Sequence, residues 1–596
     1  MHLLRAFVTA PLIAAFAPLW QHVFRLESHG GKTILDSELE TAIYSILEEF
    51  KSPGGVAVAV VHKDPDSGTW NVETQGYGIA KADGTKVTAD TLFGIGSNSK
   101  LFTILSTGLL ISNESLSTPI SWDTKIASFV PEWALMDPLA SAESTIVDVM
   151  SHRTGLPRHD FIFRLSDSVH ESIRRLRHLK PSASFRSLHQ YNNHMYTLLS
   201  SFPSLLTGIP FETYADQFIF KPLGMDSTTH FSGQAEKSGN LADGFAREGV
   251  NRTEDLFGRG RVRAMPFWAP NDGAPGHGLS GPGGVISNAK DMATWLRTLL
   301  NEGRHPETNT TVIPSHIIRR VAAGVTVSEP VASAPELSPI VYGGGQRRGT
   351  YRGFELIEHG GSVVGFKSQV LRIPDQNLGV AVLSNDESFG TEIVETIKFR
   401  ILDKVLQLPP IDWTARFKAL VTETFTSRLP IPRPENPTLP SIPFGDLVGK
   451  YHDLGYGTIE LCRLAGFQFK SEESHHCRLL LEELRTNTTI PDTLDGRIPT
   501  FIARWDRVEF MYVSLAHFDR NLFNVSALSS IPTGNKSEPP YWTSSVSDPN
   551  LVAEFVTAED GVVGVGMSGV SGSVAGPLEG ESVKERVDVW FAKVSG

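Results

Sequence analysis

Hydrophobic positions near the start of the chain predict a helix and a β-hairpin. Residues 36–50 begin with an Asp-Ser pair suited to cap a helix and then carry apolar side chains that share one helical face: Leu39, Ile43, Ile46, Leu47 and Phe50. Two strand-like runs follow, at 56–61 and 70–77, and the residues between them are typical of a turn. The pattern therefore predicts an amphipathic opening helix followed by two paired strands.

A second group of hydrophobic runs, much later in the chain, predicts three strands and another helix. Residues 354–358, 368–373 and 379–384 are strand-like and have short polar connections. Apolar residues then recur at helical spacing: Ile393, Val394, Ile397, Ile401 and Val405. An antiparallel sheet flanked by the first and last helices, with the intervening segment as a helix-rich second lobe, accounts for this order. We therefore expect an α+β domain over residues 33–415.

Proline and strand patterns set the rest of the chain apart. Six prolines cluster in a segment that we expect to be a stiff linker over residues 425–445: Pro430, Pro432, Pro434, Pro437, Pro440 and Pro443. Beyond it, runs such as 508–513 and 587–594 are separated by turn-forming residues, which is typical of a small all-β barrel or sandwich. We expect the Gly-rich segment 561–580 to form turns and loops. Residues 446–596 are therefore predicted to form a separate β domain.

Length and charge narrow the classes of function. A chain of 596 residues exceeds what one hydrophobic core usually serves, so at least two domains are expected. Its formal net charge is -12 and it has no Lys/Arg-dense run, which argues against a nucleic-acid or anionic-membrane partner. We expect a small-molecule ester, amide or peptide substrate instead. Cys462 and Cys477 are the only cysteines, so a disulfide-rich scaffold and a multi-cysteine zinc site are excluded and one disulfide stays open.

The first residues are typical of a secretory signal. Arg5 precedes an uncharged stretch over 6–20 that contains the small-residue cleavage pattern Ala15-Phe16-Ala17. A short buried helix and an uncleaved membrane anchor are the alternatives. Six N-x-S/T sequons fit passage through a eukaryotic secretory route: Asn113, Asn251, Asn309, Asn487, Asn524 and Asn535. We therefore expect a secreted glycoprotein whose residues 1–20 are a signal peptide.

Candidate chemistry begins at Ser97 and Lys100. Residues 93–100 lead into apolar residues at helical spacing, so Ser97 is expected at the start of a helix with Lys100 on the same face. The Lys amine can then approach the Ser hydroxyl and activate it as a nucleophile, and the Ser97 N–H can face a bound carbonyl. The same S-x-x-K spacing recurs at Ser287 and Lys290, so the motif alone does not decide.

A second segment supplies a proton-transfer partner. Tyr191 is the only tyrosine in the chain with Asn two positions later. Its phenol is a candidate to carry protons between Ser97 and a leaving group. We expect Asn193 to hydrogen-bond either the substrate carbonyl or Lys100.

A third segment is His359-Gly360-Gly361-Ser362, which follows the strand at 354–358. Paired glycines let a substrate backbone approach closely, and the Ser362 N–H is a candidate to complete an oxyanion hole. Similar triplets occur at 29–31 and 237–239, but the first precedes Ser97 and the second lies in a polar stretch without a strand pattern. We therefore expect the substrate to bind along His359, Gly360, Gly361 and Ser362.

These motifs, in this order, resemble the serine β-lactamase-related superfamily, particularly class C β-lactamases, penicillin-binding D-alanyl-D-alanine carboxypeptidases, D-aminopeptidases and esterases of that fold. The resemblance covers roughly residues 35–405 and includes M-S-H-R-T-G-L-P at 150–157, K-P-L-G-M at 221–225 and G-G-V-I-S at 283–287. In the family alignment the second S-x-x-K, at 287–290, falls in a structural segment that packs behind the sheet. Ser97 therefore keeps the role of nucleophile.

The resemblance also implies a mechanism. Ser97 attacks a carbonyl, Lys100 and Tyr191 move the proton, and the Ser97 and Ser362 amides stabilise the oxyanion. No metal or organic cofactor is needed. The tail resembles the lipocalin-like β modules of some of these hydrolases, at 448–451 and 587–591.

The third motif departs from that of the antibiotic-cleaving members, which usually carry Lys-Thr-Gly or Lys-Ser-Gly. His359 and Gly360 stand in place of the cation and the hydroxyl, and a mostly neutral imidazole should hold a substrate carboxylate less tightly. The resemblance therefore implies a serine hydrolase acting on esters or amides: an esterase, a D-amino-acid peptidase or a weak β-lactamase.

Other classes of function have less support in the sequence. The chain carries neither a G-x-S-x-G nucleophile elbow nor an H-E-x-x-H zinc pattern. An acyltransferase of the same fold acting on a natural product is an alternative, because an alcohol or amine can capture the same acyl-enzyme. A non-catalytic binding or assembly module is another, although Ser97, Lys100 and Tyr191 are all retained.

Overall fold

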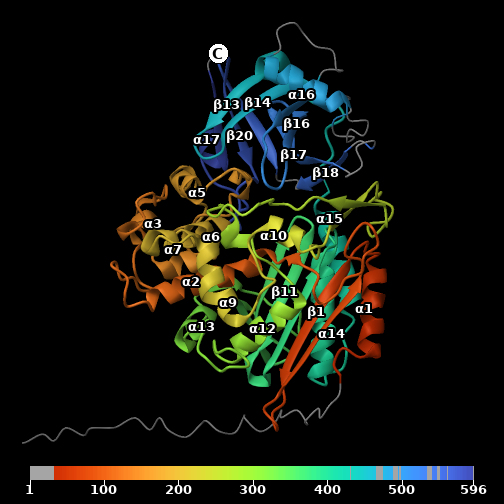
Figure 1. The fold of residues 1–596 in the computed structure, drawn as a ribbon. Coiled ribbons are helices and arrows are strands. Elements are labelled where there is room, and N and C mark those ends of the chain that lie inside the picture. Colours follow the sequence, from red (N-terminus) through yellow and green to blue (C-terminus); the bar gives the residue numbers. More distant parts are fainter. Residues whose placement is uncertain are drawn as a thin grey trace, which may run out of the picture.

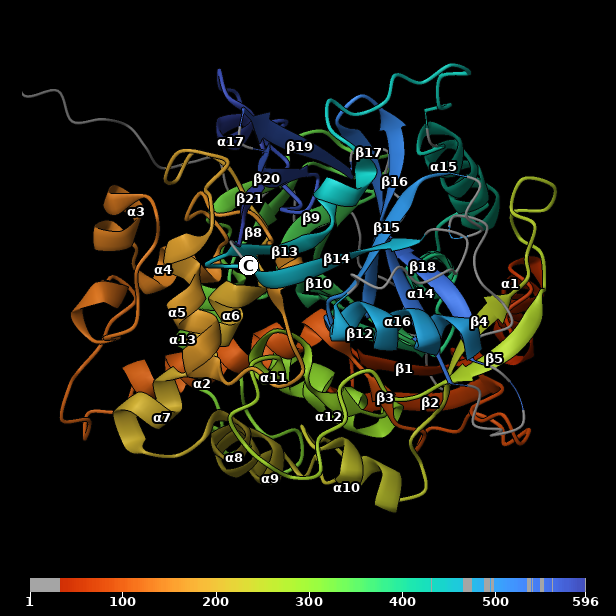
Figure 2. The same cartoon turned by 90° about the horizontal axis from the view of Figure 1, so that it is seen from above.

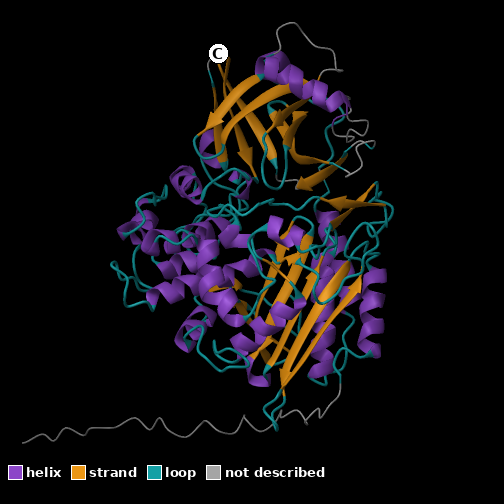
Figure 3. Ribbon diagram, in the orientation of Figure 1, coloured by secondary structure: helices purple, strands orange, loops and turns teal. Residues whose placement is uncertain are grey.

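The computed structural model describes these residues: 33–429, 431–464, 474–486, 494, 498–532, 538, 540–546, 551–559 and 561–594. The expected signal peptide at 1–20 and the sequons at Asn487 and Asn535 lie outside them. Figures 1 and 3 show a lower domain of sheet and helices and an upper domain made mostly of strands. Within the described ranges, no helix has the length and apolar character needed to cross a membrane.

An eight-stranded antiparallel sheet forms the centre of the first domain. Its strands, in spatial order, are β2 (Trp70–Gly78), β1 (Gly55–Lys63), β12 (Leu378–Ser384), β11 (Phe366–Ile373), β10 (Phe354–Val363), β9 (Arg347–Tyr351), β8 (Ile340–Tyr342) and β7 (Thr326–Glu329). Because β1 pairs with β12, strands from the two ends of the domain meet inside the sheet. The α+β prediction is confirmed, and the segment between the strand groups forms the second lobe.

Burial on both faces explains why β1 is a continuous apolar run. Ala57 and Ala59 belong to the core shared with helix α12 (Ala289–Leu300) and the helical lobe. Val56 and Val58 belong to the core beneath α1 (Ser37–Glu49) and α14 (Gly390–Val405). Side chains alternate across a strand, so a sheet covered on both sides needs apolar residues at successive positions. The sheet therefore lies between two helical layers.

The second lobe is assembled around helix α2. Its helices include α2 (Ser99–Ile111), α4 (Ile146–Met150), α5 (Val169–Arg175), α6 (Asn193–Ser200), α7 (Phe202–Thr207), α8 (Phe211–Ala215), α11 (Ser280–Gly283) and α13 (Ser315–Ala322). α2 contacts α6, α7, α8, α11 and α13 and is buried along most of its length. A helix held on so many sides gives the residues at its N-terminus a fixed position.

Helix α15 (Trp413–Ser427) ends the first domain and was not predicted from the sequence. It packs against α14, where the Trp413 ring stacks on Phe399 with ring centroids 4.2 Å apart. The described part of the proline segment that follows contains no helix or strand until a short 3-10 turn at Phe444–Leu447. Helix α15 therefore extends to Ser427, inside residues 425–445 that the proline pattern predicts to be a linker.

The second domain is a closed β barrel. Its strands are β13 (Gly449–Asp453), β14 (Gly457–Leu464), β15 (Thr500–Arg504), β16 (Tyr512–Asp519), β17 (Leu522–Ile531), β18 (Tyr541–Val546), β19 (Val552–Ala558), β20 (Gly561–Ser568) and β21 (Val589–Lys593). Pairing of β16 with β17 closes the ring, and β18 is added to the edge of β17. A disulfide joins Cys462 of β14 to Cys477 of α16 (His475–Thr486). Figure 2, seen from above, places the barrel over both the sheet and the helical lobe.

Two expectations for the second domain were wrong in part. Residues 508–511 form a loop rather than a strand, and β16 begins only at Tyr512. The loop is held by the first domain, because Val508 N donates to Phe163 O, and such a contact overrides local β-propensity. In the Gly-rich segment, residues 561–568 form β20 instead of turns. Glycine is required there because a Cβ on Gly564 would lie 2.5 Å from Phe591 O.

Candidate active site

Ser97 lies in a 3-10 turn (Gly96–Asn98) directly before α2, as its position ahead of an apolar helix predicts. Gly96 adopts φ 53, and a Cβ on it would lie 2.7 Å from Ser362 N, so only glycine lets this turn approach β10 so closely. Asn98 Nδ2 donates to Ser368 Oγ over 2.8 Å, which ties the turn to β11. The nucleophile candidate is thus fixed between α2 and the sheet.

Lys100 is fully buried and directed at Ser97. Its Nζ lies 3.0 Å from Ser97 Oγ and donates to Asn193 Oδ1 over 2.7 Å and to Pro282 O over 2.9 Å. Burial and the Arg158 cation lower the pKa of Lys100 well below its usual value. A neutral amine has two N–H donors and one lone pair. In that form, with Asn193 and Pro282 taking both donors, the lone pair would face the Ser97 hydroxyl.

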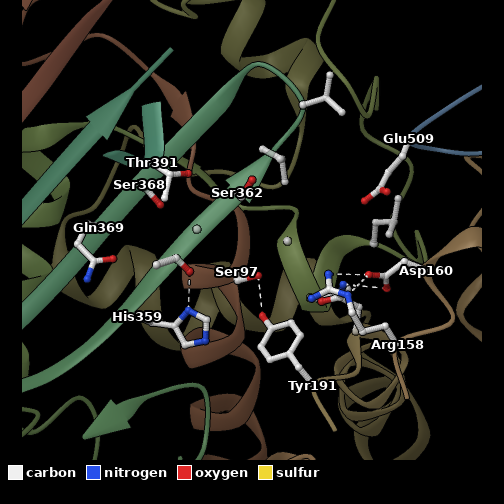
Figure 4. A pocket seen from close by; sticks show the side chains of 18 of the residues that line it. Ser97, Arg158, Asp160, Tyr191, His359, Ser362, Ser368, Gln369, Thr391 and Glu509 are labelled. Carbon is white, nitrogen blue, oxygen red and sulfur yellow. Dashed lines mark hydrogen bonds and ion pairs between the residues drawn. The ribbon is translucent and has the colours of Figure 1, made fainter. Parts of the chain in front are cut away.

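Tyr191 approaches Ser97 from another side. Its hydroxyl donates to Ser97 Oγ over 2.8 Å (Figure 4). Lys100 Nζ lies 4.8 Å from the centre of the Tyr191 ring. Burial raises the pKa of Tyr191 to about 12, against the opposing effects of Ser97 and Arg158. Tyr191 is therefore a neutral phenol at ordinary pH and can act as a proton donor.

Asn193 begins α6 and contacts Lys100, one of the two partners expected from the sequence. Its amide Oδ1 accepts from Lys100, while its Nδ2 donates to Asp160 Oδ1 over 3.0 Å. A carboxylate only accepts hydrogen bonds, so the amide NH₂ must face Asp160 and the amide oxygen must face the lysine. The orientation of Asn193 is fixed by its two neighbours.

The glycine motif lies within β10, which is longer than predicted and reaches Val363. β9 pairs only with Phe354–Glu358, so in the described part of the chain no strand continues along that edge beyond Glu358. A Cβ on Gly361 would lie 2.0 Å from Ile95 O, whereas the closest contact of one on Gly360 would be the Gln369 amide oxygen at 3.1 Å. Gly361 therefore sets the distance between β10 and the Ser97 turn, and Figure 4 shows β10, with Ser362 on it, passing next to Ser97.

His359 is buried beside the site and uncharged. Its Nε2 lies 3.0 Å from the Tyr342 hydroxyl. Burial, with a smaller effect of the nearby Lys100, lowers the pKa of His359 to about 3. The position that carries a cation in the antibiotic-cleaving enzymes thus holds a neutral ring here.

The competing motifs lie elsewhere. Ser287, in the short strand β6 (Ile286–Ser287), is buried and shares a hydrogen bond with Thr228 Oγ1, while Lys290 forms an exposed ion pair with Asp90. Residues 237–239 end α10 (Ser232–Lys237) in an exposed turn, and 29–31 are outside the described ranges. The structure brings together Ser97, Lys100, Tyr191 and Asn193 with the motif at 359–362, but not the second S-x-x-K.

A cavity of about 420 Å³ opens over these groups. Its walls include residues that the sequence analysis missed, from both domains: Arg158, Asp160, Trp268, Gln369 and Glu509. Figure 4 shows the Arg158–Asp160 ion pair and Glu509 on the side of the cavity away from Gln369. Arg158 and Asp160 directly follow the motif at 150–157, which could have drawn attention to them. Glu509 comes from the loop after β15, and no local signal connects it to Ser97.

Burial and the neighbouring Asp160 carboxylate raise the pKa of Glu509 to about 7. No group of three or more His, Cys, Asp or Glu side chains suited to a metal ion occurs among the described residues.

Sequence comparisons with known proteins agree with the motifs. The sequence model of the beta-lactamase family matches residues 45–400. Over 462 residues the chain is 31% identical to the unguisins hydrolase ungD of Aspergillus violaceofuscus, covering 72% of this chain and 77% of that protein. It is 25% identical to the N-acetylmuramyl-L-alanine amidase of Bacillus subtilis, over 50% of this chain and 69% of that protein. The octameric penicillin-binding protein homologue from Pyrococcus abyssi matches with a TM-score of 0.49 and 18% identity, covering 89% of this chain and 97% of that one.

Proposed function

This chain belongs to the beta-lactamase family, and from that premise we propose that it is a serine hydrolase that cleaves esters or amides through an acyl-enzyme on Ser97. One observation carries the proposal. The two N–H donors of a neutral Lys100 are taken by Asn193 and Pro282, so its lone pair is left facing the Ser97 hydroxyl. A base oriented in this way can accept the proton at the moment Ser97 attacks.

Acylation then proceeds by three proton transfers. Ser97 Oγ bonds to the substrate carbonyl carbon while its proton passes to Lys100 Nζ, and the Ser97 and Ser362 amides stabilise the oxyanion. As the bond to the leaving group breaks, the Tyr191 hydroxyl protonates the departing oxygen or nitrogen. The Lys100 ammonium beside the Tyr191 ring favours the resulting phenolate and returns the proton to it. Water releases the acyl group by the same transfers in reverse.

The chemistry of the cavity supports esters, amides or peptides over β-lactam antibiotics. A neutral His359 and the hydrogen side chain of Gly360 offer no cation and no hydroxyl to a substrate carboxylate. Apolar walls such as Phe163 and Trp268 suit an uncharged acyl or side-chain group instead. Similarity to a fungal enzyme named as a hydrolase supports water, rather than another acceptor, as the partner that releases the acyl group.

Steady-state kinetics test this proposal. We expect wild type to turn over a panel of p-nitrophenyl esters and peptide anilides and to hydrolyse a penicillin much more slowly. Ser97→Ala should abolish turnover of every substrate in the panel. Added alcohols or amines should leave the acid as the main product, whereas ester or amide products in their place would establish the acyltransferase. Wild type without any Ser97-dependent turnover would indicate a binding module and refute the proposal.

We further propose that the protein is secreted. The disulfide between Cys462 and Cys477 supports this, because disulfides persist in oxidising compartments. The sequon asparagines Asn251 and Asn309 are exposed, as glycan attachment requires. Expression with the native N-terminus tests the proposal: the medium should contain a protein that starts near residue 21 and gains mobility on glycosidase treatment. A protein retained in the cells with an intact N-terminus would contradict it.

A further inference from the structure

Three consecutive residues, Arg158, His159 and Asp160, lie between the catalytic lysine and the barrel. We propose that Asp160 is a positioning residue that holds Asn193 against Lys100, and that the barrel holds Asp160 in place through His159. The inference rests on the proposed function, because it assigns Lys100 as the base for Ser97. It gives the barrel a part in catalysis that the family motifs do not include.

The first link is the hydrogen bond between Asp160 and Asn193. Asp160 Oδ1 accepts from Asn193 Nδ2 over 3.0 Å, and this contact forces the Asn193 oxygen toward Lys100. If Asn193 turned over, its NH₂ would face the lysine and compete with the Ser97 proton for the lone pair. Asp160 therefore determines where the Lys100 lone pair points without touching Lys100.

The second link is electrostatic. Asp160 Oδ2 accepts from Arg158 Nε over 2.7 Å, so the carboxylate and the guanidinium form an ion pair beside the site. Arg158 lowers the pKa of Lys100 and Asp160 raises it, so removing one or the other should move that pKa in opposite directions. The remaining titratable groups around Lys100 are the phenols of Tyr191 and Tyr196 and the imidazoles of His152 and His359, and these are neutral at ordinary pH.

The third link is made by His159, which is fully buried and adopts φ 47. A non-glycine residue in this region is strained and must be held by its surroundings. His159 Nε2 contacts Lys180 O over 2.9 Å, and a carbonyl only accepts, so Nε2 carries the proton. Burial lowers the pKa of His159, so the ring is neutral and Nδ1 accepts from the Tyr456 hydroxyl over 2.6 Å. Both tautomer and orientation are therefore set by its partners.

The barrel makes two more contacts with the same segment. The backbone N–H of His159 donates to Ser571 O over 2.9 Å. The Arg158 stem lies against Gly572, where a Cβ would be only 3.0 Å from Arg158 Cδ. Tyr456, Ser571 and Gly572 all belong to the barrel domain. The barrel thus holds His159, the next residue Asp160 bonds Asn193, and Asn193 bonds Lys100.

The rate of Ser97 phosphonylation by a fluorophosphonate, followed by intact mass from pH 5 to 9 on the full chain, tests the Asp160 link. Asp160→Leu should lower the rate at its plateau by about 10-fold to 100-fold. Asp160→Asn keeps an acceptor for Asn193 and should recover much of that loss. Both should move the acidic limb of the profile to lower pH, and Arg158→Met should move it to higher pH, because the reactive form carries neutral Lys100.

A matched control separates positioning from general damage. Asp167 forms a similar buried ion pair with Arg175 in the same lobe but does not contact Asn193. Asp167→Asn should lower Tm while leaving the midpoint of the acidic limb unchanged. Midpoints that shift in the same direction for Asp160→Asn and Arg158→Met, or that do not shift, would overturn the assignment.

The barrel link is tested by removing a single hydroxyl. Tyr456→Phe should lower the labelling rate by about threefold to tenfold, which corresponds to the loss of one hydrogen bond. Tyr451→Phe is the control, because the Tyr451 hydroxyl donates to Leu447 O within the barrel domain and not to His159. Equal rates in the two variants would overturn the role of the barrel. A wild-type protein that is not labelled at Ser97 would instead refute the proposed function.

Discussion

Gly361→Ala should disable the site by moving β10 away from Ser97. The added Cβ would lie 2.0 Å from Ile95 O and 2.3 Å from Ser368 Oγ, and the first of these is backbone that cannot rotate aside. A carbon and an oxygen need about 3.3 Å, so the strand or the Ser97 turn must retreat by about 1 Å. Since Ser362 follows Gly361, its N–H retreats with it from the oxyanion. We expect kcat to fall by about 10²-fold, or about 2.7 kcal/mol of barrier.

Gly360→Ala is the matched control. There the closest contact of the added Cβ is the Gln369 side-chain oxygen at 3.1 Å, which can rotate away, and Ser368 O lies at an ordinary contact distance of 3.9 Å. The assay is kcat and kcat/KM for a p-nitrophenyl ester, with Tm measured for each variant to verify folding. Gly360→Ala should keep kcat within about threefold of wild type, because β10 stays in place and any effect of the added methyl on a substrate lying along Gly360 falls on KM. A folded Gly361→Ala variant with wild-type kcat would refute the oxyanion hole between Ser97 and Ser362.

Further predictions concern proton transfer, pH and the disulfide. Lys100→Ala and Tyr191→Phe should each lower kcat by about 10²–10⁴-fold. Wild-type kcat in both variants would contradict proton transfer through Lys100 and Tyr191. The pKa of Glu509 is raised to about 7, so folding favours its protonated form. The wild type should therefore lose stability relative to Glu509→Gln as pH rises from about 4.5 to 7. Tm values of both proteins at pH 5 and pH 8 measure this, and a Tm difference between them that is the same at both pH values would contradict it. Cys462 and Cys477 are 15 residues apart, so reduction should destabilise the barrel by about 3 kcal/mol, measured by urea unfolding with and without reductant; equal midpoints would contradict this.

Elements set by local patterns were predictable from the sequence. The helix at 36–50 is confirmed as α1, with Asp36 as its cap, because apolar spacing and capping are local properties. The limits of β10 were not predictable, because glycines weaken a strand pattern, yet pairing with β11 carries the strand through Gly361 opposite Ser368. Tertiary pairing decides such cases.

Site residues divide in the same way. Ser97 and Lys100 are three residues apart on one helical face, so their proximity follows from sequence spacing. Glu509 reaches the cavity only because the barrel packs on the first domain, and no periodicity encodes that contact. The choice between two partners for Asn193 likewise required the position of Asp160, which fixes the amide orientation.

The acyl-enzyme itself is the most direct test of the central claim. Protein exposed to a p-nitrophenyl ester and quenched in acid within milliseconds should gain the mass of one acyl group, and digestion should place that group on the peptide containing Ser97. Ser97→Ala should gain no mass under the same conditions. An adduct that persists in Ser97→Ala, or that maps to another residue of the wild type, would contradict the account.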